Sequence, residues 1–155
     1  MIVDTGCTRP IFTVPKQCID NFTAKTTAIG LAKRGDKLLA TGEGTLFIDV
    51  RNNDGSWAPM QIQHMLHAPL ACASLMPIIR FTDKKLIVVF TEYTIEIKRS
   101  LTSAALISGK RRGDLYYIKF SLKNEPKEET AFSAAKDDVY ELHCTYNHKP
   151  LRVLR

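Results

Sequence analysis

Asp4, Thr5 and Gly6 form the motif of this chain that most clearly suggests a reactive site. A short apolar run, Ile2-Val3, precedes them, so we expect a strand end followed by a tight turn, where glycine also allows another chain to approach closely. A carboxylate held at such a turn could take a proton from water as a general base. Asp and Gly are also common in ordinary turns, and on these residues alone both interpretations stay open.

Further segments follow this motif at intervals along nearly the whole chain. In order they are Ile2-Val3-Asp4-Thr5-Gly6-Cys7-Thr8, Thr41-Gly42-Glu43-Gly44-Thr45, Leu66-His67-Ala68-Pro69-Leu70, Ser74-Leu75-Met76-Pro77-Ile78-Ile79, Gly113-Asp114-Leu115-Tyr116, and Leu142-His143 with His148. Together they resemble the protease region of the Gag-Pol polyprotein of copia-type retrotransposons, followed by the start of its pre-integrase segment. A match to one of these segments alone would be weak evidence, but their common order makes the resemblance specific.

The resemblance implies an all-β fold: a retropepsin-like closed barrel, or acid-protease half, with hairpins and one short helix, followed by a small helical C-terminal tail. It also implies an aspartic endopeptidase that processes its own polyprotein. That chemistry needs two carboxylates sharing one proton. The chain has a single Asp-Thr-Gly, so an active enzyme would be a homodimer in which each subunit contributes Asp4. Thr5 would brace the opposite loop, and Gly6 would let the two carboxylates approach.

A second hypothesis belongs to another class of protein. The chain could be a catalytically inactive retrotransposon-derived remnant that acts as a β-rich interaction module. The two hypotheses differ in the need for a dimer and in the effect of replacing Asp4. Neither requires a metal or an organic cofactor in the protease region, and the first requires a polypeptide substrate.

The segment Gly42-Glu43-Gly44 resembles the flap that folds over a bound peptide, because main-chain recognition needs mobility and close backbone approach. The alternative is a β-bulge or kink in an ordinary hairpin. In other aspartic proteases two apolar residues followed by glycine thread through the loop that carries the catalytic acid. Leu75-Met76 and Ile78-Ile79 are the candidates here, and neither is followed by glycine, so the choice between them stays open.

His143 and His148 are separated by four residues, a spacing that zinc ligands can have. A structural zinc site normally takes four ligands, and no Cys-x2-Cys follows. The resemblance supports these histidines as ligands in a complete downstream segment, whereas within this chain exposed non-ligand histidines are favoured. His64 and His67 have no acidic or cysteine companions nearby in the sequence, and we expect them on a strand surface.

Short β-rich runs separated by turn signals predict the elements that position these residues. Residues 52–55, Asn-Asn-Asp-Gly, are the strongest hairpin signal, and residues 59–67 after them alternate apolar with polar as a half-buried strand does. Residues 86–90 and 93–97 predict a second hairpin. A third is predicted from 104–107 and 115–120, with Lys110-Arg111-Arg112-Gly113 as its turn. A short helix is predicted within 71–81.

Bulk composition fits an ordinary globular protein. The 155 residues are 45% hydrophobic and 25% charged, with a formal net charge of +6. The basic residues lie in small scattered groups without interleaved aromatics, so nucleic-acid binding is not favoured. No signal peptide or membrane-spanning run is evident, which predicts an intracellular protein without a membrane partner, cytoplasmic or, within an element's particle, nuclear. In that setting the four cysteines are expected to be free thiols.

Three regions are expected from the resemblance and from a change in composition. Residues 1–120 would be the protease domain, lacking its usual N-terminal strand. Residues 121–138 are polar and charged and include a proline, which is typical of a linker. Residues 139–155 would be the truncated start of a pre-integrase zinc-binding-like segment.

Overall fold

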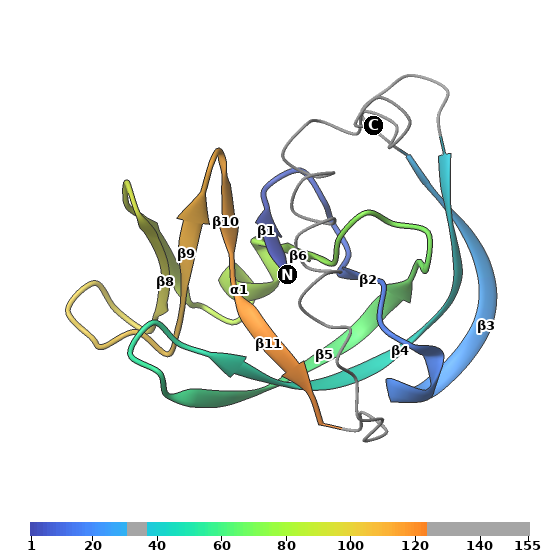
Figure 1. Cartoon of the computed structure of the whole chain (residues 1–155), viewed down its shortest axis with the longest axis horizontal. Helices are drawn as coiled ribbons and strands as arrows, with labels where there is room; N and C mark the ends of the chain where they lie inside the picture. Colours follow the sequence, from blue (N-terminus) through green and yellow to red (C-terminus); the bar gives the residue numbers. More distant parts are fainter. Residues whose placement is uncertain (31–36, 124–155) are drawn as a thin grey trace, which may run out of the picture.

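Figure 1 shows the protein as a computed structural model, which describes residues 1–30 and 37–123. The strands are β1 Ile2–Asp4, β2 Ile11–Phe12, β3 Ile19–Gly30, β4 Lys37–Arg51, β5 Trp57–His67, β6 Leu75–Pro77, β7 Ile87–Phe90, β8 Thr94–Lys98, β9 Ile107–Arg112, β10 Leu115–Tyr117 and β11 Lys119–Leu122. The helices are a 3₁₀ turn, Lys16–Cys18, and α1, Ile79–Thr82. The prediction of a mainly β protein is confirmed.

The strands form one open sheet in the order β11-β4-β5-β2-β6-β1-β10-β9-β8-β7. Strand β3 lies off this path and pairs with the first part of β4, whereas β11 pairs with its last part. The long strands β3, β4 and β5 curve around one side of the molecule, and β8, β9 and β10 stand on the other (Figure 1). Within the described residues β11 and β7, the ends of this path, are not paired with each other. The closed barrel of the prediction is therefore not confirmed.

The hairpin predicted at residues 52–55 joins β4 to β5. Arg51 pairs with Trp57, and Gly55 has a φ of 87°, a conformation that glycine adopts without steric cost. In β4 the buried residues Leu46, Ile48 and Val50 alternate with more exposed ones, as expected for a strand with one face on the core. Local turn chemistry and period-two patterning thus specify this hairpin.

The β7–β8 hairpin forms as predicted, with Ile87 paired to Lys98 and Phe90 to Ile95. The third hairpin differs from the prediction. Lys110, Arg111 and Arg112 belong to β9 and pair with β10, so the turn lies at Gly113 and Asp114. Gly113 has a φ of 58°. The glycine marks the turn correctly, whereas the three cations form the exposed C-terminal half of β9.

Two apolar clusters lie within the sheet. The main core contains fully buried side chains from both halves of the strand order, including Phe12, Leu46, Met76, Ile95 and Ile118. A smaller cluster contains Ile11, Ala40, Leu66, Ala68 and Ala71. Because β2 and β6 contribute to these clusters or pack beside them, the chain around Asp4 is anchored to the core on both sides.

The predicted short helix is present as α1, which follows β6 directly. Strand β11 extends to Leu122, past the predicted domain boundary at residue 120. The predictions for the remaining C-terminal region, namely most of the linker, the helical tail and His143 with His148, lie outside the described residues.

Candidate functional site

Asp4 is the last residue of β1, as the sequence predicts. Its backbone is fixed by β6, which runs parallel to β1 with Asp4 opposite Pro77. The N–H of Ile78 donates a hydrogen bond of 3.1 Å to the Asp4 carbonyl. On its other side β1 pairs with β10, with Val3 opposite Tyr116. Asp4 is therefore carried by a strand that is paired on both sides.

Strand β6 lies between β1 and β2 in the sheet, although β1 and β2 are consecutive in sequence. Leu75 pairs with Ile2 of β1 in parallel and with Ile11 of β2 in antiparallel orientation. The connection from Asp4 to Ile11 therefore passes around β6. Of the two candidate threading segments, Leu75-Met76 is in this position, whereas Ile79 begins α1. Met76 is 1% exposed, which explains why the segment must be apolar.

The Asp4 carboxylate is held by its own loop. Oδ1 accepts a hydrogen bond of 2.7 Å from the N–H of Gly6, and a Cβ atom at Gly6 would lie 3.3 Å from that oxygen. The backbone φ of Gly6 is not in the left-handed region. Glycine is therefore required here for close approach to Asp4. Asp4 itself is half-buried, whereas Thr5 and Gly6 are exposed, so both could be reached by a second subunit.

The Cys7 side chain contacts the backbone of Asp4. Its Sγ is 4.0 Å from the Asp4 carbonyl oxygen. Burial raises the pKa of the thiol to about 11, and the negative charge of Asp4 adds to the effect. The thiol thus stays protonated at neutral pH and fills space beside Asp4 without introducing a second charge.

Arg9 is a site residue that the sequence did not reveal. Its Nη2 lies 2.7 Å from Oε2 of Glu43 in β4 and 3.0 Å from the backbone carbonyl of His64 in β5. The hydrogen bond from Arg9 lowers the pKa of Glu43 below its ordinary value. Arg9 thus ties the loop that follows Asp4 to two strands. Its partners are too distant in sequence for any local pattern to indicate them.

Gly42, Glu43 and Gly44, the predicted flap residues, lie inside β4 rather than at a hairpin tip. Gly42 pairs with Ala24 of β3 and with His67 of β5. The connection between β3 and β4 falls at residues 31–36, which lie outside the described residues. The register shift after Gly44 puts the extra residue in β5, where Gln63 and His64 lie opposite Thr45 alone. A Cβ atom at Gly42 would meet the Phe22 ring, so this glycine allows β3 to pack closely.

His67 differs from the strand-surface position expected for it. The residue is 7% exposed, and its Nε2 lies 2.9 Å from the Val14 carbonyl. A carbonyl can only accept, so Nε2 donates. Nδ1 lies 2.7 Å from Oγ1 of Thr41, and both ring nitrogens are therefore satisfied. His64 is exposed, as expected. His67 fastens β5 to the segment after β2, which is a structural role.

A metal centre is not evident in the part of the chain that the structure describes. Within residues 1–30 and 37–123, no group of three or more His, Cys, Asp or Glu side chains is placed to hold a metal ion. None of the helices in these residues is long and apolar enough to cross a membrane. Comparisons of the chain with protein-family models, curated proteins and solved structures gave no significant match.

Proposed function

We propose that this chain is the retropepsin-like aspartic endopeptidase of a copia-type retrotransposon Gag-Pol polyprotein. In this proposal Asp4 from each of two subunits activates a water molecule for peptide hydrolysis. The observation that carries the proposal is the passage of β6 between β1 and β2. It supports the proposal because a catalytic carboxylate must be held rigidly, and this arrangement anchors both ends of the loop that bears Asp4.

The reaction follows from two carboxylates sharing one proton. Their like charges at close range prevent both from ionising together, so one is a base while the other remains an acid. The ionised Asp4 would take a proton from water, and the protonated Asp4 of the second subunit would polarise the scissile carbonyl. The Gly6 N–H bonded to Oδ1 would keep each carboxylate in one orientation. In this proposal the protease region uses neither a metal nor an organic cofactor.

The dimer is part of the proposal because the sequence holds a single Asp-Thr-Gly. Thr5 and Gly6 are exposed and would meet their symmetry-related copies at a two-fold axis. The substrate would be an extended polypeptide, held mainly by main-chain hydrogen bonds in the manner of strand addition.

The test compares the purified chain with its Asp4→Asn variant on a library of fluorogenic peptides. Asp114→Asn is the matched control, because Asp114 is fully exposed at the β9–β10 turn and pairs there with Arg111. We expect cleavage by the native chain and by Asp114→Asn, inhibition by a statine-type transition-state analogue, and no cleavage by Asp4→Asn. Sedimentation equilibrium should show a dimer in every active sample. Cleavage that persists in Asp4→Asn would refute the proposal.

A non-catalytic interaction module is the second candidate, and one observation favours it. Two large apolar side chains of the β7–β8 hairpin are exposed: Phe90 is 42% and Tyr93 is 71% exposed. Isolated exposed apolar groups are ordinary, whereas a contiguous patch is typical of a protein-binding surface, and in this candidate function the hairpin forms such a patch. This candidate predicts a monomer that cleaves no peptide and whose partner binding is unchanged by Asp4→Asn but weakened by Tyr93→Ser.

A further inference from the structure

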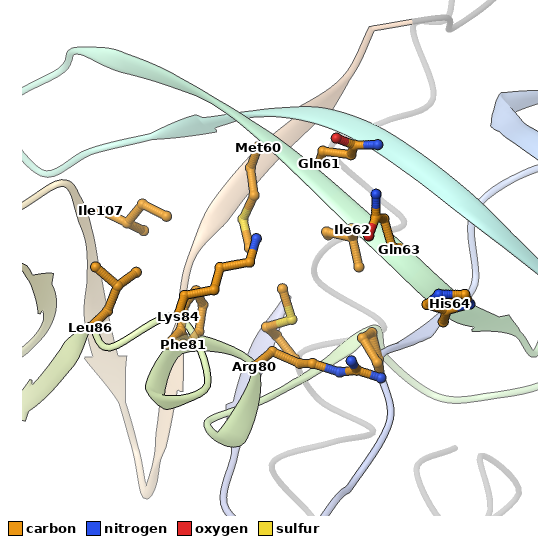
Figure 2. A pocket seen from close by; sticks show the side chains of 12 residues that line it. Met60, Gln61, Ile62, Gln63, His64, Arg80, Phe81, Lys84, Leu86 and Ile107 are labelled. Atoms are coloured by element: carbon orange, nitrogen blue, oxygen red, sulfur yellow. The ribbon is translucent and has the colours of Figure 1, made fainter.

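A pocket of about 170 Å³ lies between β5 and the chain that leads from α1 into β7. One end of its lining is apolar and includes Met60, Leu86 and Ile107. Arg80 extends from α1 toward the other end, near His64, and Lys84 extends toward Met60 (Figure 2). The pocket borders the Asp4 loop, because Pro10 of that loop and Met76 of β6 line it, whereas neither Asp4 nor Cys7 does.

The charged residues that line the pocket are all basic. Arg80 and Lys84 line it, and no aspartate or glutamate is among its lining residues. The Nε of Arg80 is buried and has no hydrogen-bond partner among the described residues. A buried donor without a partner is unusual. Because this nitrogen is closed to solvent, a bound acceptor would satisfy it only after the Arg80 side chain shifts. Because guanidinium groups pair with carboxylates in bidentate geometry, the pocket is suited to a carboxylate with an adjoining apolar group.

The edge of β5 beside the pocket is available for strand addition up to Gln63. At His64 the backbone φ is 55° and the carbonyl already accepts a hydrogen bond from Arg9. Consecutive residues from Met60 to His64 line the pocket. Strand β2 pairs with β5 only at Leu66 and His67, so in the described sheet the preceding part of β5 is paired only with β4. An unpaired strand edge presents backbone donors and acceptors to an extended peptide. A peptide, unlike a small amphiphile, would use this edge as well as the pocket.

The size of the pocket also favours one residue of a peptide. Its volume of about 170 Å³ is below the roughly 300 Å³ at which pockets for drug-sized ligands begin. One apolar side chain and a terminal carboxylate would be accommodated, whereas a nucleotide or an organic cofactor would not. The net charge of +6 on the chain would further favour an anionic group.

We propose that this pocket binds the carboxyl-terminal end of an extended peptide whose last side chain is apolar. Arg80, assisted by Lys84, holds the terminal carboxylate. The last side chain lies against Met60, Leu86 and Ile107, and the peptide backbone runs along the open edge of β5. The inference does not rest on the proposed peptidase activity, because none of Asp4, Thr5 and Gly6 lines the pocket.

The test is fluorescence anisotropy with an amino-terminally labelled peptide, Gly-Ser-Thr-Val-Leu, as the free acid and as the carboxyl-terminal amide. The Asp4→Asn chain is used throughout, so that cleavage cannot consume the peptide. We expect the free acid to bind and the amide to bind at least about tenfold more weakly, since a charge-assisted hydrogen-bond pair is lost. Arg80→Gln should weaken binding of the free acid by a similar factor.

Two further variants keep the test decisive. Lys84 is exposed, so Lys84→Gln should fold normally and weaken binding about two- to fivefold. Lys110→Gln, at an exposed cation of β9 outside the pocket, should leave binding unchanged. Equal affinity for acid and amide, or unchanged affinity in both Arg80→Gln and Lys84→Gln, would overturn the proposal. Displacement of the peptide by an equal concentration of octanoate would also overturn it, in favour of a fatty carboxylate.

Discussion

Arg9 and Glu43 join the loop that follows Asp4 to the middle of β4, with 2.7 Å between Nη2 and Oε2. The two side chains are each about one-third exposed, so the pair is a partly screened contact of modest strength. The pair matters because of the segments that it connects. The same guanidinium bonds the His64 carbonyl, so that a single side chain connects the candidate catalytic loop to both β4 and β5.

Replacing Glu43 by glutamine should change the acid sensitivity of the fold. The hydrogen bond from Arg9 lowers the pKa of Glu43 in the folded state. The pair therefore stabilises the fold above the unfolded-state pKa, about 4.3, and this contribution is lost as the pH falls through the lowered value. We expect the native chain to lose more thermal stability than Glu43→Gln when the pH is lowered from 6 to 3.

The measurement is the midpoint of thermal unfolding by circular dichroism across that pH range. Glu92→Gln is the control, because Glu92 is an exposed glutamate in the β7–β8 turn. The control should retain the pH dependence of the native chain. If Glu43→Gln loses stability with acid as steeply as the native chain, the Arg9–Glu43 contact does not contribute in solution.

Gly6→Ala should impair catalysis more than folding. The new Cβ would lie 3.3 Å from Oδ1 of Asp4, close enough to displace the carboxylate by a few tenths of an ångström. Since an error of 1 Å can cost about a hundredfold in rate, we expect kcat/KM to fall about tenfold. The loop is exposed and the φ of Gly6 is not left-handed, so stability should change by less than about 0.5 kcal/mol.

Peptide cleavage and thermal unfolding are measured together for Gly6→Ala, with Gly30→Ala as the control. A Cβ at Gly30 would meet nothing within 4 Å, so this variant should keep both activity and stability. A large fall in the stability of Gly6→Ala with proportionate loss of activity would show that Gly6 serves the fold and not the orientation of Asp4.

Gly42→Ala and Gly44→Ala should each destabilise the fold by about 1–3 kcal/mol, the usual cost of overpacking. At Gly42 the added Cβ would lie 2.7 Å from the Thr23 carbonyl oxygen, and at Gly44 it would lie 2.8 Å from that of Asp20. These atoms are backbone and cannot rotate away. Denaturant unfolding measures the effect. A flap role would instead leave stability nearly unchanged and reduce only peptide binding, an outcome that would contradict the packing role.

Cys7 should resist alkylation in the folded chain. Its pKa is raised from 9.0 to about 11, so at pH 8 the thiolate fraction is about one hundredfold lower than in an unfolded chain. Iodoacetamide labelling of the Cys7 peptide, followed by mass spectrometry with and without urea, tests this. Asp4→Asn should speed labelling only modestly, because burial is the larger cause. Rapid labelling of the folded native chain would show that the loop is open.

The raised pKa of Cys7 also predicts the direction of an alkaline effect. The folded thiol holds its proton more tightly than the unfolded one. Well below pH 9 the thiol is protonated in both states, so its ionisation does not affect the stability there. Above that value the unfolded chain ionises first, and stability falls until the folded thiol also ionises near pH 11. Cys7→Ser should lack this decline in thermal stability between pH 9 and 11.

Several local features of this protein could be predicted from its amino-acid sequence. The turn at residues 52–55, the alternation of Leu46, Ile48 and Val50, and the position of Asp4 at a strand end follow from turn chemistry and from the two-residue period of a strand. Each depends on residues within a few positions of one another, so a local pattern is sufficient.

The contacts between these local features could not be predicted from the sequence and became visible in the folded protein. The placement of Leu75-Met76 between β1 and β2, the contact between Arg9 and Glu43, and the burial of His67 join residues that are distant in sequence. Such pairings depend on how the whole chain packs. The sequence also does not distinguish a glycine in a mobile flap from a glycine in a strand that packs against an aromatic ring. Gly42 is an example, because the Phe22 ring that its lack of a Cβ accommodates lies on another strand.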